Sequence, residues 1–308
     1  MNLELLITEF LEYLEIEKGC SPLTARVYRH YLKRFYNWLT ENYSTTKPED
    51  IDLELIRRYR LYLAHLRNRN GVQLKRSSQS YHIIALRAFL RYLLVKRDIP
   101  TLSPGKIELP KQGSRSIAFL DSGQIERLLN SPKISNNIGL RDKTILETLF
   151  STGLRVSELV SLNRDQIDLE RQEFGVKGKG NKIRVVFLSD TAAQWIKRYL
   201  QSRQDRFKPL FIRYSGRVDS EKNGEKMRLT ARSIQRIVDK YAKRCGLPIK
   251  VSPHTLRHSF ATDLLISGAD IRSVQEMLGH ESITTTQVYT HVTNRHLKEI
   301  HRAFHNRR

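Results

Sequence analysis

Five short stretches in the second half of the chain carry side chains that could do chemistry. In the strongest, SPHTLRH, Ser252 can cap a helix and Pro253 suits its first turn. His254 and Arg257 then lie three residues apart on one helical face, near a helix N-terminus that attracts anions. A phosphate suits this arrangement better than a carboxylate substrate or a metal ion. The alternative for His254 is a capping or core histidine.

Two further stretches, TGLRVSEL and KGKGNK, each also allow a purely structural explanation. Arg155 follows a glycine break at a predicted helix boundary, and it could simply be a surface arginine that pairs with Glu158. Lys179 lies among glycines, which let a backbone come close to a ligand, so the lysine could reach into a groove. The alternative for Lys179 is a solvated turn.

The last two stretches, LGH and TTTQVY, follow the predicted helix that ends near Leu278. Gly279 ends that helix and Ser282 begins another, which isolates His280 at a junction where its side chain can point into a cleft. Tyr289 comes nine residues after His280 and is one of 13 tyrosines, so its position alone does not single it out.

The first hundred residues are predicted to form a compact bundle of about four helices. Apolar residues repeat at helical spacing from Leu3 to Leu14, and Gly19 closes this helix. Ser21-Pro22 begins the second helix, and further helices are predicted over residues 52–68 and 77–96. The apolar face of the second helix includes Val27, Tyr28, Tyr31, Leu32, Phe35 and Leu39.

Prolines, glycines and basic residues interrupt the helical pattern between residues 100 and 116, which predicts an extended linker. Two β-prone runs follow at residues 173–176 and 183–188, and they predict a hairpin with a basic tip. The stretch 213–227 is polar and predicts a mobile loop. Helices are predicted over residues 121–130, 139–151, 190–203, 230–245, 252–267, 270–278, 282–289 and 293–304.

The composition favours a polyanionic partner. The 308 residues carry a formal net charge of +22, with Lys and Arg in excess in both halves of the chain. The two cysteines, Cys20 and Cys245, form no CxxC motif or Cys/His cluster, so we expect free thiols and no structural zinc. No signal peptide or membrane span is predicted, so we expect a cytoplasmic, nucleoid-associated protein and no membrane partner.

Taken together, the stretches TGLRVSEL, KGKGNK, SPHTLRHSFAT, LGH and TTQVYTHV resemble the tyrosine recombinase (phage integrase) family, and within it the Xer recombinases that resolve chromosome or plasmid dimers. The N-terminal stretches EKGCSPLTARVYRHYLKRFYNWL and SYHIIALRAFLRYL are similar to the family's core-binding domain. The resemblance covers nearly the whole chain. It implies six catalytic positions, which are Arg155, Lys179, His254, Arg257, His280 and the nucleophile Tyr289.

The resemblance also implies the fold and the partners. The expected fold is mainly α with a small antiparallel β-hairpin, in two domains: a helical SAM-like core-binding domain (1–100), a linker (101–116) and an α+β catalytic domain (117–308) with a C-terminal docking helix. The expected partners are double-stranded DNA with a specific recombination site, a homo- or hetero-tetramer of recombinase on that DNA, and a DNA translocase as an optional activator. No cofactor, metal or ATP is expected.

The resemblance implies cleavage through a 3′-phosphotyrosine and strand exchange through a Holliday junction. A mobile-element integrase is the closest alternative, although it often carries an extra arm-binding domain. A type IB topoisomerase shares the chemistry but would relax DNA without a target site. A catalytically silent DNA-binding regulator is the alternative outside the enzymes, and the intact set of six residues argues against it.

Overall fold

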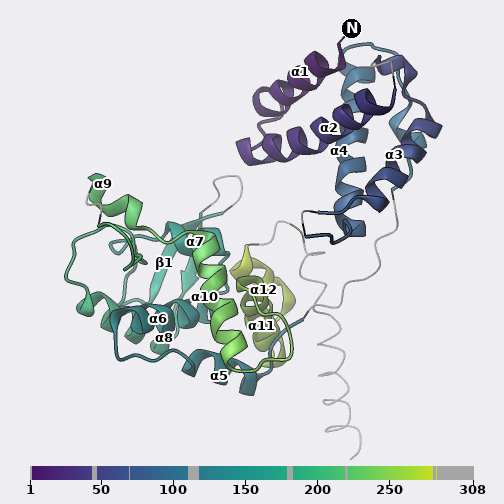
Figure 1. The fold of residues 1–308 in the computed structure, drawn as a ribbon. Helices are drawn as coiled ribbons and strands as arrows, with labels where there is room; N and C mark the ends of the chain where they lie inside the picture. The colour runs from purple at the N-terminus through teal and green to yellow at the C-terminus, as the bar shows by residue number, and fades with distance from the viewer. Residues whose placement is uncertain are drawn as a thin grey trace, which may run out of the picture. The chain divides into compact units, whose positions relative to one another are not determined.

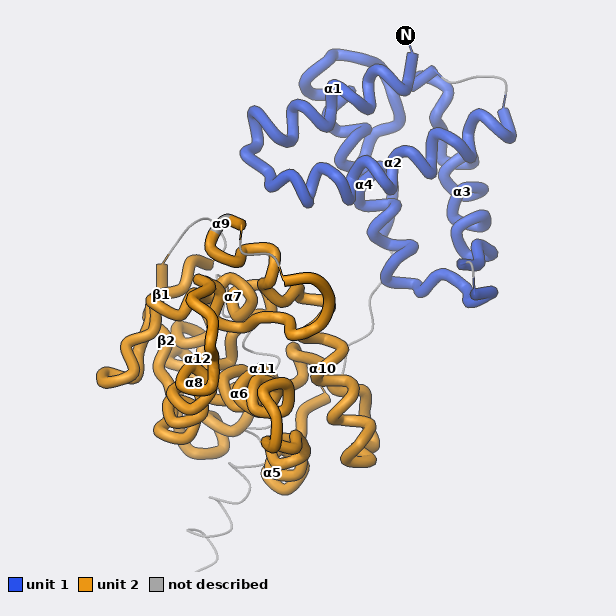
Figure 2. Tube along the Cα trace, turned by 60° about the vertical axis from the view of Figure 1, so that its left-hand side comes forward, with its two compact units in different colours: residues 1–114 blue, residues 115–308 orange. Residues whose placement is uncertain are grey.

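The protein is described by a computed structural model, which covers residues 2–43, 47–68, 70–109, 118–178, 183–218, 221–279 and 282. The chain divides into two compact units, residues 1–114 and 115–308 (Figure 1, Figure 2). Each unit has its own apolar core. The described residues are mainly helical, with one two-stranded antiparallel sheet, which confirms the predicted fold class.

Unit 1 is a bundle of four α-helices. Helix α4 contacts each of the other three, so it forms the centre of the bundle. The helices are α1 (Leu3–Ile16), α2 (Pro22–Asn42), α3 (Leu53–His65) and α4 (Arg76–Lys96), and two short 3-10 turns lie at η1 (Pro48–Asp50) and η2 (Pro104–Lys106).

The helix starts follow from local capping chemistry. The Ser21 hydroxyl accepts a hydrogen bond from the Thr24 N–H, and Pro22 occupies the first turn of α2, as predicted. The Asp52 carboxylate caps α3 in the same way. Helix α3 ends at His65, three residues before the predicted end, because the backbone turns extended at Leu66 and pairs with the segment that precedes α4.

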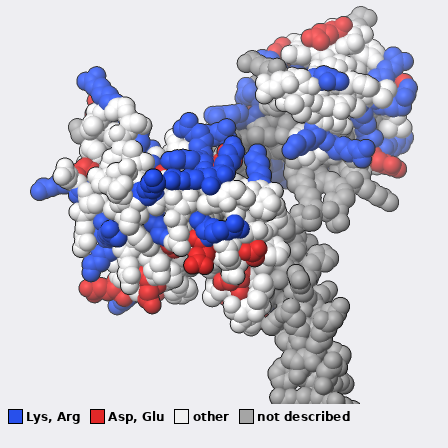
Figure 3. All heavy atoms as spheres, turned by 60° about the horizontal axis from the view of Figure 1, so that its bottom comes forward, with Lys and Arg blue, Asp and Glu red and all other residues white. Residues whose placement is uncertain are grey.

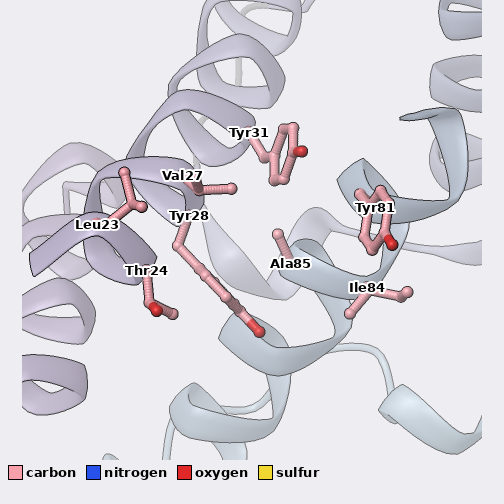
Figure 4. Close-up of a pocket in the computed structure, with 8 residues that line it drawn as sticks. All are labelled: Leu23, Thr24, Val27, Tyr28, Tyr31, Tyr81, Ile84 and Ala85. Atoms are coloured by element: carbon pink, nitrogen blue, oxygen red, sulfur yellow. The ribbon is translucent and has the colours of Figure 1, made fainter. Parts of the chain in front are cut away.

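The predicted apolar face of α2 divides into two parts. Leu32, Phe35 and Leu39 are buried in the core, as expected. Val27 and Tyr31 lie outside the core, and Tyr28 is only partly buried against it. Instead they line an open groove of about 450 Å³ between α2 and α4, together with Leu23, Thr24, Tyr81, Ile84 and Ala85 (Figure 4).

Part of the stretch predicted as a linker packs against unit 1. Ile107 is 1% exposed and belongs to the core of this unit. The Thr101 hydroxyl donates a hydrogen bond to the Pro48 carbonyl at 2.9 Å. Residues 110–117 lie outside the described part of the chain.

Unit 2 is built around the long helix α6, which packs against α5, α8, α10, α11 and β2. The elements of unit 2 are α5 (Ser122–Asn130), α6 (Asn137–Thr152), α7 (Val156–Ser161), β1 (Glu173–Lys177), β2 (Ile183–Phe187), α8 (Asp190–Ser202), α9 (Glu221–Gly224), η4 (Glu225–Met227), α10 (Ala231–Arg244), α11 (Pro253–Ile266) and α12 (Ile271–Leu278).

Helix α6 is buried on almost every side, so even its charged side chains must find partners inside the unit. Lys143 and Glu147 form a buried ion pair at 2.7 Å, one helical turn apart. Asp142 accepts hydrogen bonds from its neighbour Arg141 and from the Tyr241 hydroxyl of α10. The two ion pairs lie within α6, and the Tyr241 contact ties α6 to α10.

The predicted hairpin is present. Strands β1 and β2 pair antiparallel, with Glu173 opposite Phe187 and Lys177 opposite Ile183. The tip at residues 179–182 lies outside the described part of the chain.

Two features of unit 2 differ from the sequence prediction. The short helix α7 was not predicted. The stretch 213–227, predicted as a mobile loop, has no helix or strand over residues 213–218, but it contains the short helices α9 and η4 from Glu221 to Met227. The Lys208 N–H donates to the Asn223 carbonyl, which joins this stretch to the preceding segment, and the adjacent Arg228 guanidinium donates to the Val160 and Leu162 carbonyls.

Candidate active site

Arg155 is placed by a glycine break between two helices. Helix α6 ends at Gly153, whose φ of 58° is the left-handed conformation that favours glycine. The chain then turns, and Arg155 becomes the residue before the first turn of α7. This is the boundary position that the sequence predicted for Arg155.

The carboxylate of Glu158 fixes Arg155. It accepts hydrogen bonds from the Arg155 backbone N–H at 2.8 Å and from the Arg155 guanidinium at 2.9 Å. Burial alone would raise the pKa of Glu158, but hydrogen bonds from Arg184 and Arg155 outweigh it and hold this pKa at about 2. The predicted Glu158–Arg155 salt bridge is thus confirmed. The Arg155 side chain nevertheless remains 32% exposed, so it can still meet a ligand.

Arg257 lies on α11 and is 4% exposed. Its guanidinium donates to the Gly153 carbonyl at 2.7 Å and to the Leu278 carbonyl at 2.6 Å. These two contacts join the end of α6 to the end of α12, and they hold the arginine in one orientation.

His254 lies in the first turn of α11. Ser252 caps this helix and Pro253 occupies its first turn, as predicted. The His254 side chain reaches solvent. Partial desolvation by the surrounding protein lowers its pKa below the ordinary 6.5, and the positive charges of Arg257 and Arg155 lower it further. The three predicted residues thus lie close enough to interact electrostatically.

The C-terminal end of α12 is the point at which the arginines converge. Three successive carbonyls accept from three guanidiniums: Met277 from Arg184 at 3.3 Å, Leu278 from Arg257 at 2.6 Å, and Gly279 from Arg155 at 2.9 Å. A helix C-terminus carries partial negative charge, so it attracts these cations. Several positive groups are thereby gathered at one place in unit 2.

Arg184 is the residue of this group that the sequence analysis missed. It lies on β2, and its side chain is 12% exposed. A signal was present in the sequence: Arg184 alternates with Ile183 and Val185, so it shares the face of the strand that buries Val186. A charged residue on a buried face predicts a buried partner.

The remaining three predicted residues, Lys179, His280 and Tyr289, lie outside the described residues. Their positions are known only from their place along the chain. Lys179 belongs to the four residues 179–182 between the described ends of the hairpin, and His280 directly follows Gly279.

The arrangement is suited to binding an anionic ester. Two guanidiniums provide planar, fixed donors for non-bridging oxygens. The imidazole of His254 can exchange a proton near neutral pH. Within the described part of the chain, no group of His, Cys, Asp and Glu side chains is placed to hold a metal ion.

Basic side chains gather on the surface of unit 2 and are also frequent on unit 1 (Figure 3). Helix α10 exposes five of them, which are Arg232, Arg236, Lys240, Lys243 and Arg244. Lys243 pairs with Asp239 and Lys240 lies over the Tyr241 ring, so the charge is only partly neutralised within the helix. None of the helices in the described ranges has the length and apolar character needed to cross a bilayer.

Comparison with protein families adds the deciding observation. Residues 118–296, more than half of the chain, match the phage integrase family, and this range includes all six predicted catalytic positions. Residues 7–97 match the phage integrase N-terminal SAM-like domain. The chain belongs to the phage integrase family.

Relatives along the whole length agree with this assignment. The chain is 38% identical over 308 residues to tyrosine recombinase XerD of Lacticaseibacillus casei, covering 98% of this chain and 99% of the relative. It is 38% identical over 307 residues to tyrosine recombinase XerC of Pelotomaculum thermopropionicum, covering 98% of both.

A solved structure of the XerH site-specific recombinase, described as bound to a palindromic difH substrate in a post-cleavage complex, shares the fold. It aligns with a TM-score of 0.71 at 21% identity and covers 97% of this chain and 85% of that chain. The protein is therefore a tyrosine recombinase, an enzyme of DNA strand exchange.

Proposed function

We propose that this tyrosine recombinase cuts and rejoins a specific double-stranded DNA site of the Xer type through a covalent 3′-phosphotyrosine on Tyr289. The observation that carries the proposal is the meeting of Arg155, Arg257 and His254 beside the end of α12. The relatives named XerC and XerD and the difH-bound structure support a dif-like site as the target.

The two arginines neutralise the scissile phosphate. Attack on a phosphodiester gathers negative charge on the non-bridging oxygens, and fixed donors around these oxygens stabilise that charge without reorganising. Loss of one such donor typically costs about 3 kcal/mol of transition-state stabilisation. Arg155 and Arg257 are held by backbone carbonyls, so they are oriented before DNA arrives. His280 supplies a further hydrogen bond to these oxygens.

Tyr289 attacks phosphorus with its phenolic oxygen, and the bond from phosphorus to the 5′-oxygen breaks. The ordinary pKa of tyrosine is about 10, so the phenol must pass its proton to a base. His254 takes this proton, because its lowered pKa keeps the ring neutral at pH 7. Lys179 gives a proton to the leaving 5′-oxygen.

The products are a 3′-phosphotyrosine and a free 5′-hydroxyl. The phosphotyrosine link conserves the energy of the broken ester, so rejoining needs no ATP. Attack by the 5′-hydroxyl of a partner strand restores a phosphodiester and forms a Holliday junction. Four positive or proton-donating side chains, those of Arg155, Arg257, Lys179 and His280, surround the phosphate in this mechanism, so it uses no metal ion.

The reaction is carried out by four recombinase subunits on two DNA sites, in the cytoplasm where the chromosome lies. The segment 293–304, which lies outside the described residues, docks on a neighbouring subunit. Leu297, Ile300 and Phe304 form one apolar stripe there if the segment is helical. Head-to-tail contacts of this kind close into rings. The four subunits are copies of this chain alone or of this chain together with a second Xer recombinase, and a DNA translocase is an optional activator.

A nicked suicide substrate tests the nucleophile. The nick lets a short strand diffuse away after cleavage, so the covalent protein–DNA adduct accumulates and is seen on a denaturing gel. We expect the wild-type chain to form the adduct and Tyr289→Phe to bind the DNA with unchanged affinity but form none. An adduct with the Phe variant would assign the nucleophile to another residue.

A further inference from the structure

We propose that Arg184 is a positioning residue of the active site, which holds Glu158 so that Arg155 faces the scissile phosphate. The inference deepens the proposed function and rests on the role given there to Arg155. Arg184 belongs to β2, a different element from Arg155 and Glu158, and sequence reasoning gave it no role.

The contact between Arg184 and Glu158 is bidentate. Two guanidinium nitrogens of Arg184 donate to the two carboxylate oxygens of Glu158, each at 2.8 Å. This fork-to-fork geometry fixes the plane of the carboxylate as well as its distance. Glu158 is 5% exposed, so water offers little competition for these bonds.

Glu158 is therefore shared between two arginines. Each of its oxygens accepts one hydrogen bond from Arg184 and one from Arg155, so four donors meet two oxygens. One negative charge faces two positive charges, which leaves a net positive charge on the group. Arg155 consequently keeps electrostatic attraction for a phosphate while its orientation is fixed.

Loss of Arg184 would change this balance. Glu158 would remain buried with Arg155 as its only guanidinium partner among the contacts described above, so the carboxylate would draw the Arg155 guanidinium into a closer pair. The donors that Arg155 turns toward the ligand would then lose their fixed direction. A displacement of about 1 Å at a catalytic group can cost about 10²-fold in rate.

Arg184 also reaches the third element of the site. Its Nε donates to the Met277 carbonyl at 3.3 Å, next to the carbonyls that accept from Arg257 and Arg155. A Cβ atom at Gly279 would lie 2.9 Å from the Arg184 Cδ, so the side chain packs directly over this glycine. One side chain of the hairpin thus touches both α7 and the end of α12.

The test compares two suicide substrates that differ only at the scissile phosphorus. One has the natural phosphodiester. In the other, a methyl group replaces a non-bridging oxygen, so the phosphonate has no negative charge for a guanidinium to neutralise. Arg184→Gln removes both the positive charge and the bidentate contact with Glu158, whereas Arg184→Lys keeps the charge but cannot form the bidentate contact.

We expect Arg184→Gln to slow adduct formation on the phosphodiester by roughly 10- to 100-fold at saturating protein, with unchanged DNA affinity. On the methylphosphonate, the slowing of adduct formation by Arg184→Gln should be smaller by at least about tenfold, because the charge that Arg155 stabilises is absent. Arg184→Lys should also slow cleavage of the phosphodiester more than that of the methylphosphonate. This variant replaces Arg184→Gln in the test if the Gln variant does not fold. Equal slowing of both substrates by these variants would overturn the inference, as would full activity of Arg184→Lys.

Two further variants make the result specific. Arg228→Gln is the matched control, because Arg228 also joins an ion pair and backbone carbonyls in unit 2 but does not touch Glu158. Its rate ratio between the substrates should equal that of the wild type. Arg155→Ala tests the proposed function itself. If Arg155→Ala slows adduct formation equally on both substrates, the proposed function fails. If Arg155→Ala slows cleavage of the phosphodiester selectively while Arg184→Gln slows both substrates equally, only the role of Arg184 is refuted.

Discussion

At the scale of single residues, His254 has the environment that a general base needs. It lies in the first turn of α11, reaches solvent, and has Arg257 and Arg155 close enough to lower its pKa. A base must be neutral to accept a proton, and the nearby positive charges favour the neutral ring. The same charges attract the phosphate that His254 would act on.

The cleavage rate should therefore decline only at acidic pH. The second-order rate constant for adduct formation reports the free enzyme, in which the His254 pKa lies below 6.5. We expect this constant to be at its full value at pH 7 and to fall only as the pH drops through that lowered pKa. Single-turnover measurements from about pH 5 to about pH 8 give the midpoint.

A midpoint at or above pH 6.5 would contradict the assignment of His254 as the base. His258 is a useful internal comparison. Burial first, then His254 and Arg257, lower the pKa of His258 to about 4, so its titration lies below the measured range and does not produce a midpoint within it. His254→Asn should slow cleavage and remove the midpoint from this range.

Sequence reasoning reached three residues of the described site. Capping and glycine signals placed Arg155, His254 and Arg257 near helix boundaries, and the resemblance to the tyrosine recombinase family identified them as catalytic positions. Arg184 was not predicted, because its role depends on Glu158, which is 26 residues away in the chain and on another element. Lys179, His280 and Tyr289 stay predictions.

At the scale of elements, the break between α6 and α7 decides where Arg155 lies. Gly153 has a φ of 58°, and a Cβ atom there would come within 2.4 Å of the Phe260 ring. The carbonyl of Gly153 also accepts a hydrogen bond from Arg257. Conformation, packing and the site therefore all depend on this one glycine.

Gly153→Ala should destabilise unit 2. The left-handed backbone costs an alanine roughly 1–2 kcal/mol, and overpacking against Phe260 adds roughly 1–3 kcal/mol. Gly246→Ala is the control, because Gly246 has a similar φ of 61° but nothing within 4 Å of the added atom. It should show the first cost alone.

Urea unfolding followed through Trp195, in a Trp38→Phe background, reports unit 2. Equal losses of unfolding free energy for the two glycine variants would show that the structure around Gly153 relaxes to admit the methyl group.

The long helices were predictable because their apolar spacing and caps agree. The short helix α7 was not, because six residues give too little periodicity to recognise. The stretch 213–227 is polar enough to predict a mobile loop, but α9 and η4 form within it, and the adjacent Arg228 donates to the distant Val160 carbonyl. Tertiary contacts of this kind leave no local pattern in the sequence.

At the scale of the whole molecule, charge predicts how the recombinase binds DNA. The chain carries a formal net charge of +22, and both of its compact units have basic surfaces. Each phosphate contact releases condensed counterions from DNA, so affinity falls as salt rises. A protein with two basic units on one chain should make many such contacts.

We expect the affinity for the recombination site to fall by roughly 10³- to 10⁵-fold between about 50 and about 200 mM salt, as for six to ten phosphate contacts. Fragments cut near residue 113 should each bind far more weakly and with a shallower salt slope. Fluorescence anisotropy and footprinting measure both quantities. A fragment 116–308 with undiminished affinity and footprint would show that unit 1 contributes little to binding.

The link between Arg184 and Glu158 limits how parts can be exchanged between recombinases. The hairpin, residues 173–187, looks like a cassette that could be grafted from one enzyme to another to alter DNA contacts. Its outward positions, such as Ile183 and Val185, are exposed and can change freely. Position 184 cannot, because its partner lies outside the cassette on α7. Residues 158 and 184 would have to be transferred together, and a chimera that separates them should fold but cut DNA slowly.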